Sequence, residues 1–117
     1  RRAMLFVRDH LAEPLSVERV AKVSGFAPRY FSKLFAQNEG TTFHQYVLGL
    51  RLEQAKRTLL WTTLSVERIG QLVGFSTRSH FHRAFVAAVG VTPLEYRNRS
   101  TRRERAPRKK PSKKSRA

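Results

Sequence analysis

The sequence predicts an all-α protein in which one helical unit is built twice around a long connecting helix. Three observations support this prediction. The motif Ser-Val-Glu-Arg at residues 16–19 recurs at residues 65–68, and a Gly-Phe pair follows each copy. Apolar residues recur at the three- and four-residue spacing of amphipathic helices along most of the chain. The segment 42–60 contains no proline and one glycine, which favours a single helix of about 28 Å.

The repeat has a period of about 50 residues, which is typical of one supersecondary unit that occurs twice. The offset between the copies is 49 residues as far as Gly25 and Gly74, and it becomes 50 because the second copy then carries one extra residue. The later matched pairs are Phe31 and Phe81, Phe35 and Phe85, Gly40 and Gly90, Thr42 and Thr92, and Tyr46 and Tyr96.

The first unit is expected to contain three helices. Residues 3–12 form a short amphipathic helix. Ser16 is a good N-cap for the second helix, which Gly25 ends. Pro28 suits the first turn of the third helix, which Gly40 ends. The apolar side chains expected to pack together here are Leu5, Phe6, Val7, Leu11, Val17, Val20, Ala21, Val23, Tyr30, Phe31, Leu34 and Phe35.

The connecting helix, residues 42–60, carries two apolar stripes. The first stripe consists of Phe43, Tyr46, Val47 and Leu50, and the second consists of Leu48, Leu52, Ala55 and Leu59. A helix with two apolar stripes must be covered on two sides. We therefore expect this helix to pack against one unit near its start and against the other near its end.

The second unit repeats the order of the first. Ser65 caps its first helix, and Ser76 or Thr77 starts the next helix after the turn. Gly90 ends that helix, and the Thr-Pro pair at 92–93 begins a final turn or two. The expected core consists of Val66, Ile69, Leu72, Val73, Phe81, Ala84, Phe85 and Ala88, covered by Leu94 and Tyr96.

The chain has a net charge of +16, and this charge is unevenly distributed. Residues 99–117 contribute +9, whereas residues 1–98 contribute +7. From Arg102 onward there is no apolar periodicity, so the end of the chain is expected to be disordered. The expected divisions are a first helix-turn-helix subdomain at 3–41, the connector at 42–60, a second subdomain at 61–98 and a disordered basic tail at 99–117. Since the folded part is basic by itself, we expect a polyanionic partner.

Several other classes of protein and site do not fit the sequence. No segment is long and apolar enough to span a membrane, and no signal peptide is evident. The absence of cysteine excludes disulfide scaffolds and thiolate zinc sites, and it agrees with a cytoplasmic location. No metal site or cofactor is expected, because His80 and His82 point to different faces of their helix. Asp9 is the only aspartate, and neither a nucleophile elbow nor a phosphate-binding loop is present, so we expect no enzymatic activity.

The helix-turn-helix pattern points to double-stranded DNA. Such a motif places its second helix in the major groove, and major-groove faces on one side of a duplex recur every ~34 Å. A connector of about 28 Å suits two adjacent faces. The outward residues that suit bases or phosphates are Arg29, Ser32 and Lys33 in one unit, and Arg78, Ser79, His82 and Arg83 in the other. The helix starts capped by Ser16 and Ser65 are candidate phosphate sites. Because the copies differ at these positions, we expect an asymmetric site.

The segments 74–85 and 90–97 resemble those of the AraC/XylS family of bacterial transcription regulators, and the similarity extends to 15–46 and 50–55. The resemblance covers about residues 3–98. It implies a seven-helix, two-lobed DNA-binding domain, with base contacts from the seven outward residues named above. It also implies a sensing or dimerising domain upstream of the first residue, which is not Met, and contact with RNA polymerase during activation, in the bacterial nucleoid.

Two features depart from the family's usual pattern. Gly70 stands where the family commonly has alanine, and this glycine is expected to loosen its helix by up to ~1 kcal/mol. The long basic tail is not a standard part of the family. This tail leaves one alternative open, a nonspecific polyanion binder that acts on nucleic acid or on a membrane surface. A protein-interaction module without DNA binding is the third interpretation.

Overall fold

The structure is a computed structural model that describes the backbone of residues 2–105 and the side chains as far as Ser100. This part of the chain forms seven α-helices and contains no strand, so the all-α prediction is confirmed. The helices are α1 (Arg2–Asp9), α2 (Val17–Ser24), α3 (Pro28–Glu39), α4 (Phe43–Trp61), α5 (Val66–Leu72), α6 (Arg78–Val89) and α7 (Pro93–Arg105).

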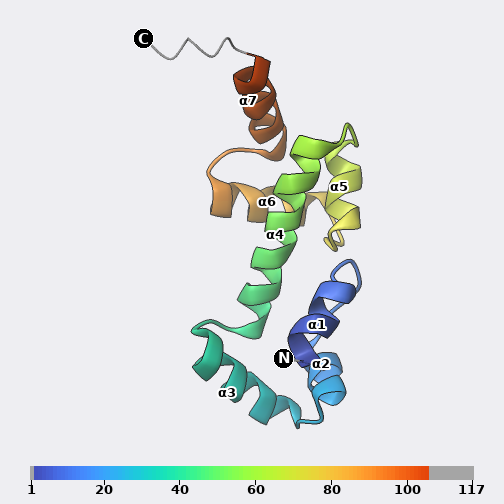
Figure 1. Ribbon diagram of the computed structural model, residues 1–117, viewed down its shortest axis with the longest axis vertical. Helices are drawn as coiled ribbons and strands as arrows, with labels where there is room; N and C mark the ends of the chain where they lie inside the picture. The colour runs from blue at the N-terminus through green and yellow to red at the C-terminus, as the bar shows by residue number, and fades with distance from the viewer. Residues whose placement is uncertain (1, 106–117) are drawn as a thin grey trace.

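The helices form two lobes that are joined by α4 (Figure 1). Helices α1, α2 and α3 pack around the start of α4, and helices α5, α6 and α7 pack around its end. The molecule is elongated, with extents of 56 × 28 × 22 Å, and α4 runs along its long axis. No described helix combines the length and apolar character needed to span a membrane.

Hydroxyl side chains start several of the helices as N-caps. The Ser16 Oγ atom accepts a hydrogen bond of 3.0 Å from the backbone N–H of Arg19, and Ser65 accepts the equivalent bond from Arg68. Thr42 caps α4 in the same way. Of the two residues proposed to start α6, Thr77 is the cap. These caps satisfy backbone N–H groups that lack partners inside the helix.

Each lobe has its own core, and α4 contributes one apolar stripe to each. Phe43 and Val47 are buried in the first lobe, with Tyr46 and Leu50 packed against them. The second-lobe core contains the buried side chains Leu52, Ala55 and Leu59, with Leu48 packed against them. The prediction of two stripes facing two units is therefore confirmed.

Some side chains expected in the cores are instead exposed: Leu5, Tyr30, Leu72, Leu94 and Ala88. Tyr30 is 52% exposed and packs edge-on against Phe26, which is itself on the surface. In α7, Tyr96 faces the core and lies 5.6 Å from Phe85 between ring centroids. Leu94 precedes Tyr96 by two positions, so it points away from the face that Tyr96 occupies.

Helix α7 is longer than the final turn or two that the sequence predicted, and it runs through residues 99–105 of the proposed disordered tail. That segment contains no proline or glycine, and arginine is a good helix former. The remaining part of the proposed tail, residues 106–117, lies outside the described residues.

Candidate nucleic-acid interface

The second helix of each unit is fixed by aromatic packing on its inner face. In α3, Phe31 and Phe35 are buried and lie 5.6 and 5.5 Å from the ring of Phe43 on α4. In α6, Phe81 and Phe85 are almost fully buried. Because these rings hold one face of each helix against a core, the opposite face is presented to solvent.

All seven residues predicted to contact DNA lie on these outer faces and are exposed. Arg78, Ser79, His82 and Arg83 line one shallow surface hollow of about 390 Å³ on α6. Arg29, Ser32 and Lys33 lie on α3 in the other lobe. The structure therefore brings the α6 residues together and places the α3 residues on a separate surface.

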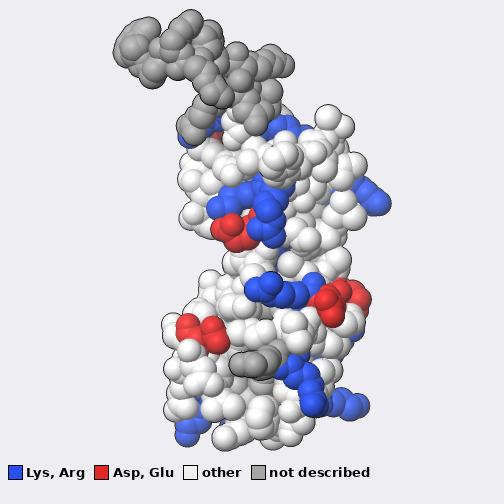
Figure 2. Space-filling view, viewed as in Figure 1, with Lys and Arg blue, Asp and Glu red and all other residues white. Residues whose placement is uncertain are grey.

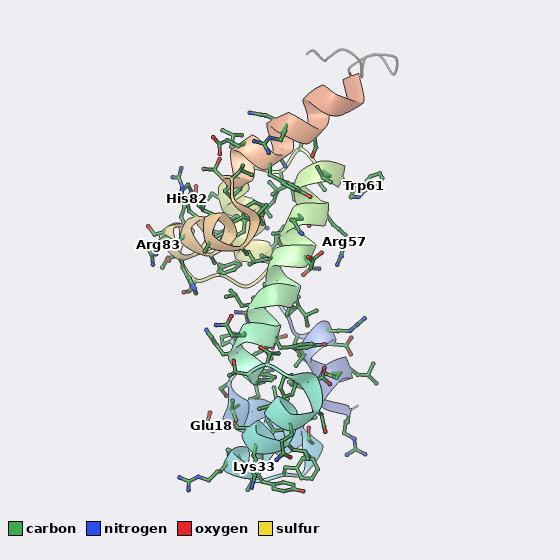
Figure 3. All side chains as sticks on the ribbon, turned by 90° about the vertical axis from the view of Figure 1, so that its left-hand side faces the viewer. Glu18, Lys33, Arg57, Trp61, His82 and Arg83 are labelled. Atoms are coloured by element: carbon green, nitrogen blue, oxygen red, sulfur yellow. The ribbon has the colours of Figure 1, made fainter. Side chains whose placement is uncertain are left out.

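The exposed charge on the two helices is mostly positive. Helix α6 contains no acidic residue, and α3 contains a single one, Glu39, at its last position. His82 and Arg83 project to one side of the molecule, whereas Arg57 and Trp61 project to the opposite side (Figure 3). On the face drawn in Figure 2, Lys and Arg are scattered over both lobes, with Asp and Glu beside them.

The two proposed phosphate sites have a mixed environment. Ser16 and Ser65 are exposed at the starts of α2 and α5, but each hydroxyl already accepts a backbone hydrogen bond. Glu18 and Glu67 lie in the same first turns, where their negative charge opposes that of a phosphate. Phosphate binding at these positions stays a prediction, and the geometry supports it less than it supports contacts by α3 and α6.

Two partly buried arginines, Arg51 and Arg97, join segments that are far apart in the chain, and the sequence analysis gave them no role. The Nε atom of Arg51 donates to the backbone oxygen of Leu11 at 3.1 Å, and its Nη2 atom donates to that of Glu13 at 2.9 Å. Arg97 donates to the backbone oxygens of Leu59 and Thr62 at 3.0 and 3.1 Å. Nothing in the sequence spacing marks these arginines, because their acceptors lie 35 to 40 positions away.

A reciprocal cap at the start of α7 was also missed, although its signal is present. Thr92 accepts from the backbone N–H of Glu95, and the carboxylate of Glu95 accepts from the backbone N–H of Thr92. The spacing Thr-x-x-Glu before a helix is the capping-box pattern. This cap fixes the turn between α6 and α7.

Three groups have shifted pKa values, each with a local cause. Burial lowers the pKa of the Arg51 guanidinium from its ordinary value. The pKa of Glu95 is lowered by the backbone hydrogen bond from Thr92 and then by the Thr92 hydroxyl. The hydrogen bond from Arg19 lowers the pKa of Glu13, with which it forms an ion pair of 2.7 Å.

Comparison with known proteins gives consistent results. A family model described as a helix-turn-helix domain matches residues 20–99. The xylose operon regulatory protein of Escherichia coli K12 is 32% identical over 82% of this chain and 24% of its own length. The chain spans less than half the length of the first curated relatives that it matches.

Two solved structures share the fold. A transcriptional regulator with an AraC-type DNA-binding domain from Chromobacterium violaceum has a TM-score of 0.78 and is 34% identical, over 84% of this chain and 88% of that chain. The DNA-binding domain of AdpA, solved with a target DNA, has a TM-score of 0.85 and is 25% identical. It covers 90% of this chain and 95% of its own.

Proposed function

Because this chain belongs to the AraC/XylS-type family of helix-turn-helix DNA-binding domains, we propose that it reads one asymmetric DNA site with both lobes. The chain is a DNA-binding domain with two helix-turn-helix motifs, and it is not an enzyme. In the proposal, α3 and α6 enter adjacent major-groove segments of one duplex.

The observation that carries this proposal is that α3 and α6 belong to different lobes, and that these lobes pack around different halves of α4. The 19 residues of α4 span about 28 Å. The offsets of the two lobes from α4 add to this length, and successive major-groove faces are ~34 Å apart. The outer faces of both helices carry exposed basic and hydroxyl groups, which suit guanine edges and phosphates.

The asymmetry of the site follows from the residues on the outer faces. Helix α3 presents Arg29, Ser32 and Lys33, whereas α6 presents Arg78, Ser79, His82 and Arg83. A symmetric dimer presents the same side chains twice and therefore suits a palindrome. Two unlike sets of side chains within one chain suit two unlike half-sites.

The partners beyond DNA are also part of the proposal. The curated relatives are longer than this chain, which supports an effector or dimerisation domain elsewhere in the regulator. Contact with RNA polymerase suits a regulator of transcription, and such a protein acts in the cytoplasm at the bacterial nucleoid. The Ser16 and Ser65 helix starts are secondary phosphate contacts in this proposal.

The test is selection of duplexes from a random pool by the full chain, followed by affinity measurement on the enriched sequence and on a scrambled control. A second protein ends at Arg105, so that it keeps all of α7 but lacks the basic residues that follow. We expect both proteins to prefer the enriched duplex. The proposal is wrong if the shortened chain binds both duplexes equally.

The charge of the tail favours one second candidate, a nonspecific polyanion binder. In that case the full chain binds any duplex, and its affinity falls steeply with salt because binding releases counterions from the phosphates. Removal of residues 106–117 then abolishes binding, whereas the specific reader loses affinity equally on both duplexes and keeps its preference.

A further inference from the structure

The relative position of the two lobes depends on few contacts. Among the described helices, α4 is the one that packs substantially against both lobes. A long helix is rarely straight, so a connecting helix by itself does not fix the angle between the two lobes. The groups that join the lobes near the middle of α4 therefore decide how α3 and α6 are placed relative to each other.

Arg51 lies at this midpoint, between the stripe that faces the first lobe and the stripe that faces the second. Its partly buried guanidinium donates from two different nitrogens to the Leu11 and Glu13 carbonyl oxygens, in the loop between α1 and α2. A planar fork with two donors fixes the direction of approach as well as the distance. Arg51 thus anchors α4 to the first lobe.

The second lobe meets the same group through Gly74, in the turn between α5 and α6. A β-carbon on Gly74 would lie 2.6 Å from Nε of Arg51 and 2.5 Å from the Leu11 carbonyl oxygen. The absence of a side chain at Gly74 therefore lets this turn pack onto the arginine and onto the first lobe. Figure 1 shows the loop after α1 close to the C-terminal end of α5.

The matched glycine of the first unit gives the contrast. Gly25 and Gly74 both have positive φ angles, of 83° and 107°, so both turns favour glycine for the same conformational reason. No atom lies within 4 Å of a β-carbon on Gly25. Close approach at Gly74 is therefore a property of the junction between the lobes and not of the repeated turn.

From this geometry we propose that Arg51 is a positioning residue that sets the distance and rotation between α3 and α6. It acts through the Leu11–Glu13 loop and Gly74, and it need not touch DNA. The consequence is that Arg51 determines which spacing of half-sites the protein accepts. This inference rests on the proposed function, since it concerns a site read by both lobes.

The test uses the full chain and the duplex that it enriches from a random pool. A series of duplexes carries one, two or five extra base pairs between the halves, and another duplex has one half scrambled. One inserted base pair shifts the second half by about 3.4 Å and rotates it by about 35°. The variants are Arg51→Met and Arg51→Lys, with Arg57→Met as control, because Arg57 is exposed on the same helix.

We expect the wild-type chain to lose roughly tenfold or more in affinity when one base pair is inserted. The reason is that a rigid junction cannot follow the displaced half-site, so both lobes no longer bind the duplex at the same time. Arg51→Met is expected to lose about tenfold on the enriched duplex, and its penalty for the insertion shrinks toward none. Its affinity for the half-scrambled duplex stays at the wild-type level. Arg57→Met behaves as the wild type.

Other outcomes separate this inference from the proposed function. If Arg51→Met keeps the wild-type penalty for insertion, or weakens binding to the half-scrambled duplex equally, Arg51 does not position the lobes. If the wild-type chain shows no preference for any duplex, the proposed function fails instead. If circular dichroism shows that Arg51→Met is unfolded, Arg51→Lys decides the question. Lysine keeps the positive charge but has a single donor nitrogen in place of the planar fork, and we expect an intermediate penalty for the insertion.

Discussion

Gly70 of α5 and Phe81 of α6 pack directly against each other inside the second helix-turn-helix. A β-carbon on Gly70 would lie 2.8 Å from Cδ2 and 3.0 Å from Cγ of Phe81. Both residues are buried, and Phe81 is only 1% exposed. The glycine that the sequence marked as a weak point in its helix therefore allows α6 to approach α5.

We predict that Gly70→Ala destabilises the protein. The alanine gains about 1 kcal/mol in helix propensity, but overpacking of a tight core costs typically about 1–3 kcal/mol. The Phe81 ring cannot swing away freely, because its own Cβ lies 3.3 Å from the added atom. We expect a net loss of about 1 kcal/mol in the free energy of unfolding, measured by urea denaturation.

Gly49→Ala is the matched control for that variant. Gly49 also lies inside a helix, α4, but it is exposed and a β-carbon there meets no atom within 4 Å. Helix propensity alone then acts, and we expect a gain of up to about 1 kcal/mol. If Gly70→Ala is stabilising to the same extent, Phe81 relaxes and the packing argument is wrong.

Arg97 is predicted to contribute to stability as a cap on the end of α4. Its two hydrogen bonds reach the Leu59 and Thr62 carbonyls, which lie where a helix leaves its last oxygens without partners. Replacement by Met removes a charged donor from both, so we expect a loss of about 1–3 kcal/mol in thermal or urea unfolding. Arg97 lies on α7. Arg99→Met, at an exposed position of α7, should change stability little.

Arg83 is predicted to read one base pair. Arg83→Ala should cost about 1–3 kcal/mol of binding free energy at that base pair and relax the preference there. The measurement is the affinity for the enriched duplex and for single-base variants of it at constant salt. Arg57→Ala serves as the control, because Arg57 projects from the opposite side of the molecule (Figure 3). An equal loss on every sequence would instead mark Arg83 as a phosphate contact.

The cap between Thr92 and Glu95 predicts an acid-dependent stability. The folded-state pKa of Glu95 is lowered from 4.5, so its charged form favours the folded state. That stabilisation is complete above the unfolded-state pKa and is lost as the pH falls through the lowered value. In unfolding experiments between about pH 6 and about pH 3, Glu95→Gln should be less stable at the upper end and less sensitive to acid. An unchanged loss on acidification would show that the cap contributes nothing.

The helices apart from the length of α7, the two-lobed plan and the exposed faces of α3 and α6 could be predicted from the sequence. These follow from local or periodic signals: the hydroxyl caps such as Ser16 and Ser65, the glycine stops, and apolar spacing that must match a helical period. The phase of the repeat then fixes where α3 and α6 begin. The DNA contacts of their outer residues stay predictions.

The way in which the lobes are joined could not be predicted from the sequence. In the sequence, Gly70 is an ordinary glycine within a helix and Gly74 is an ordinary glycine in a turn. In the structure, Gly70 lies directly against Phe81 and Gly74 lies directly against Arg51, and both of these partners belong to other elements. The acceptors of Arg51 and Arg97 are backbone oxygens, which every residue carries, so no side-chain pattern could identify them. Such contacts depend on distances between segments far apart in the chain, and periodicity along one helix contains no information about those distances.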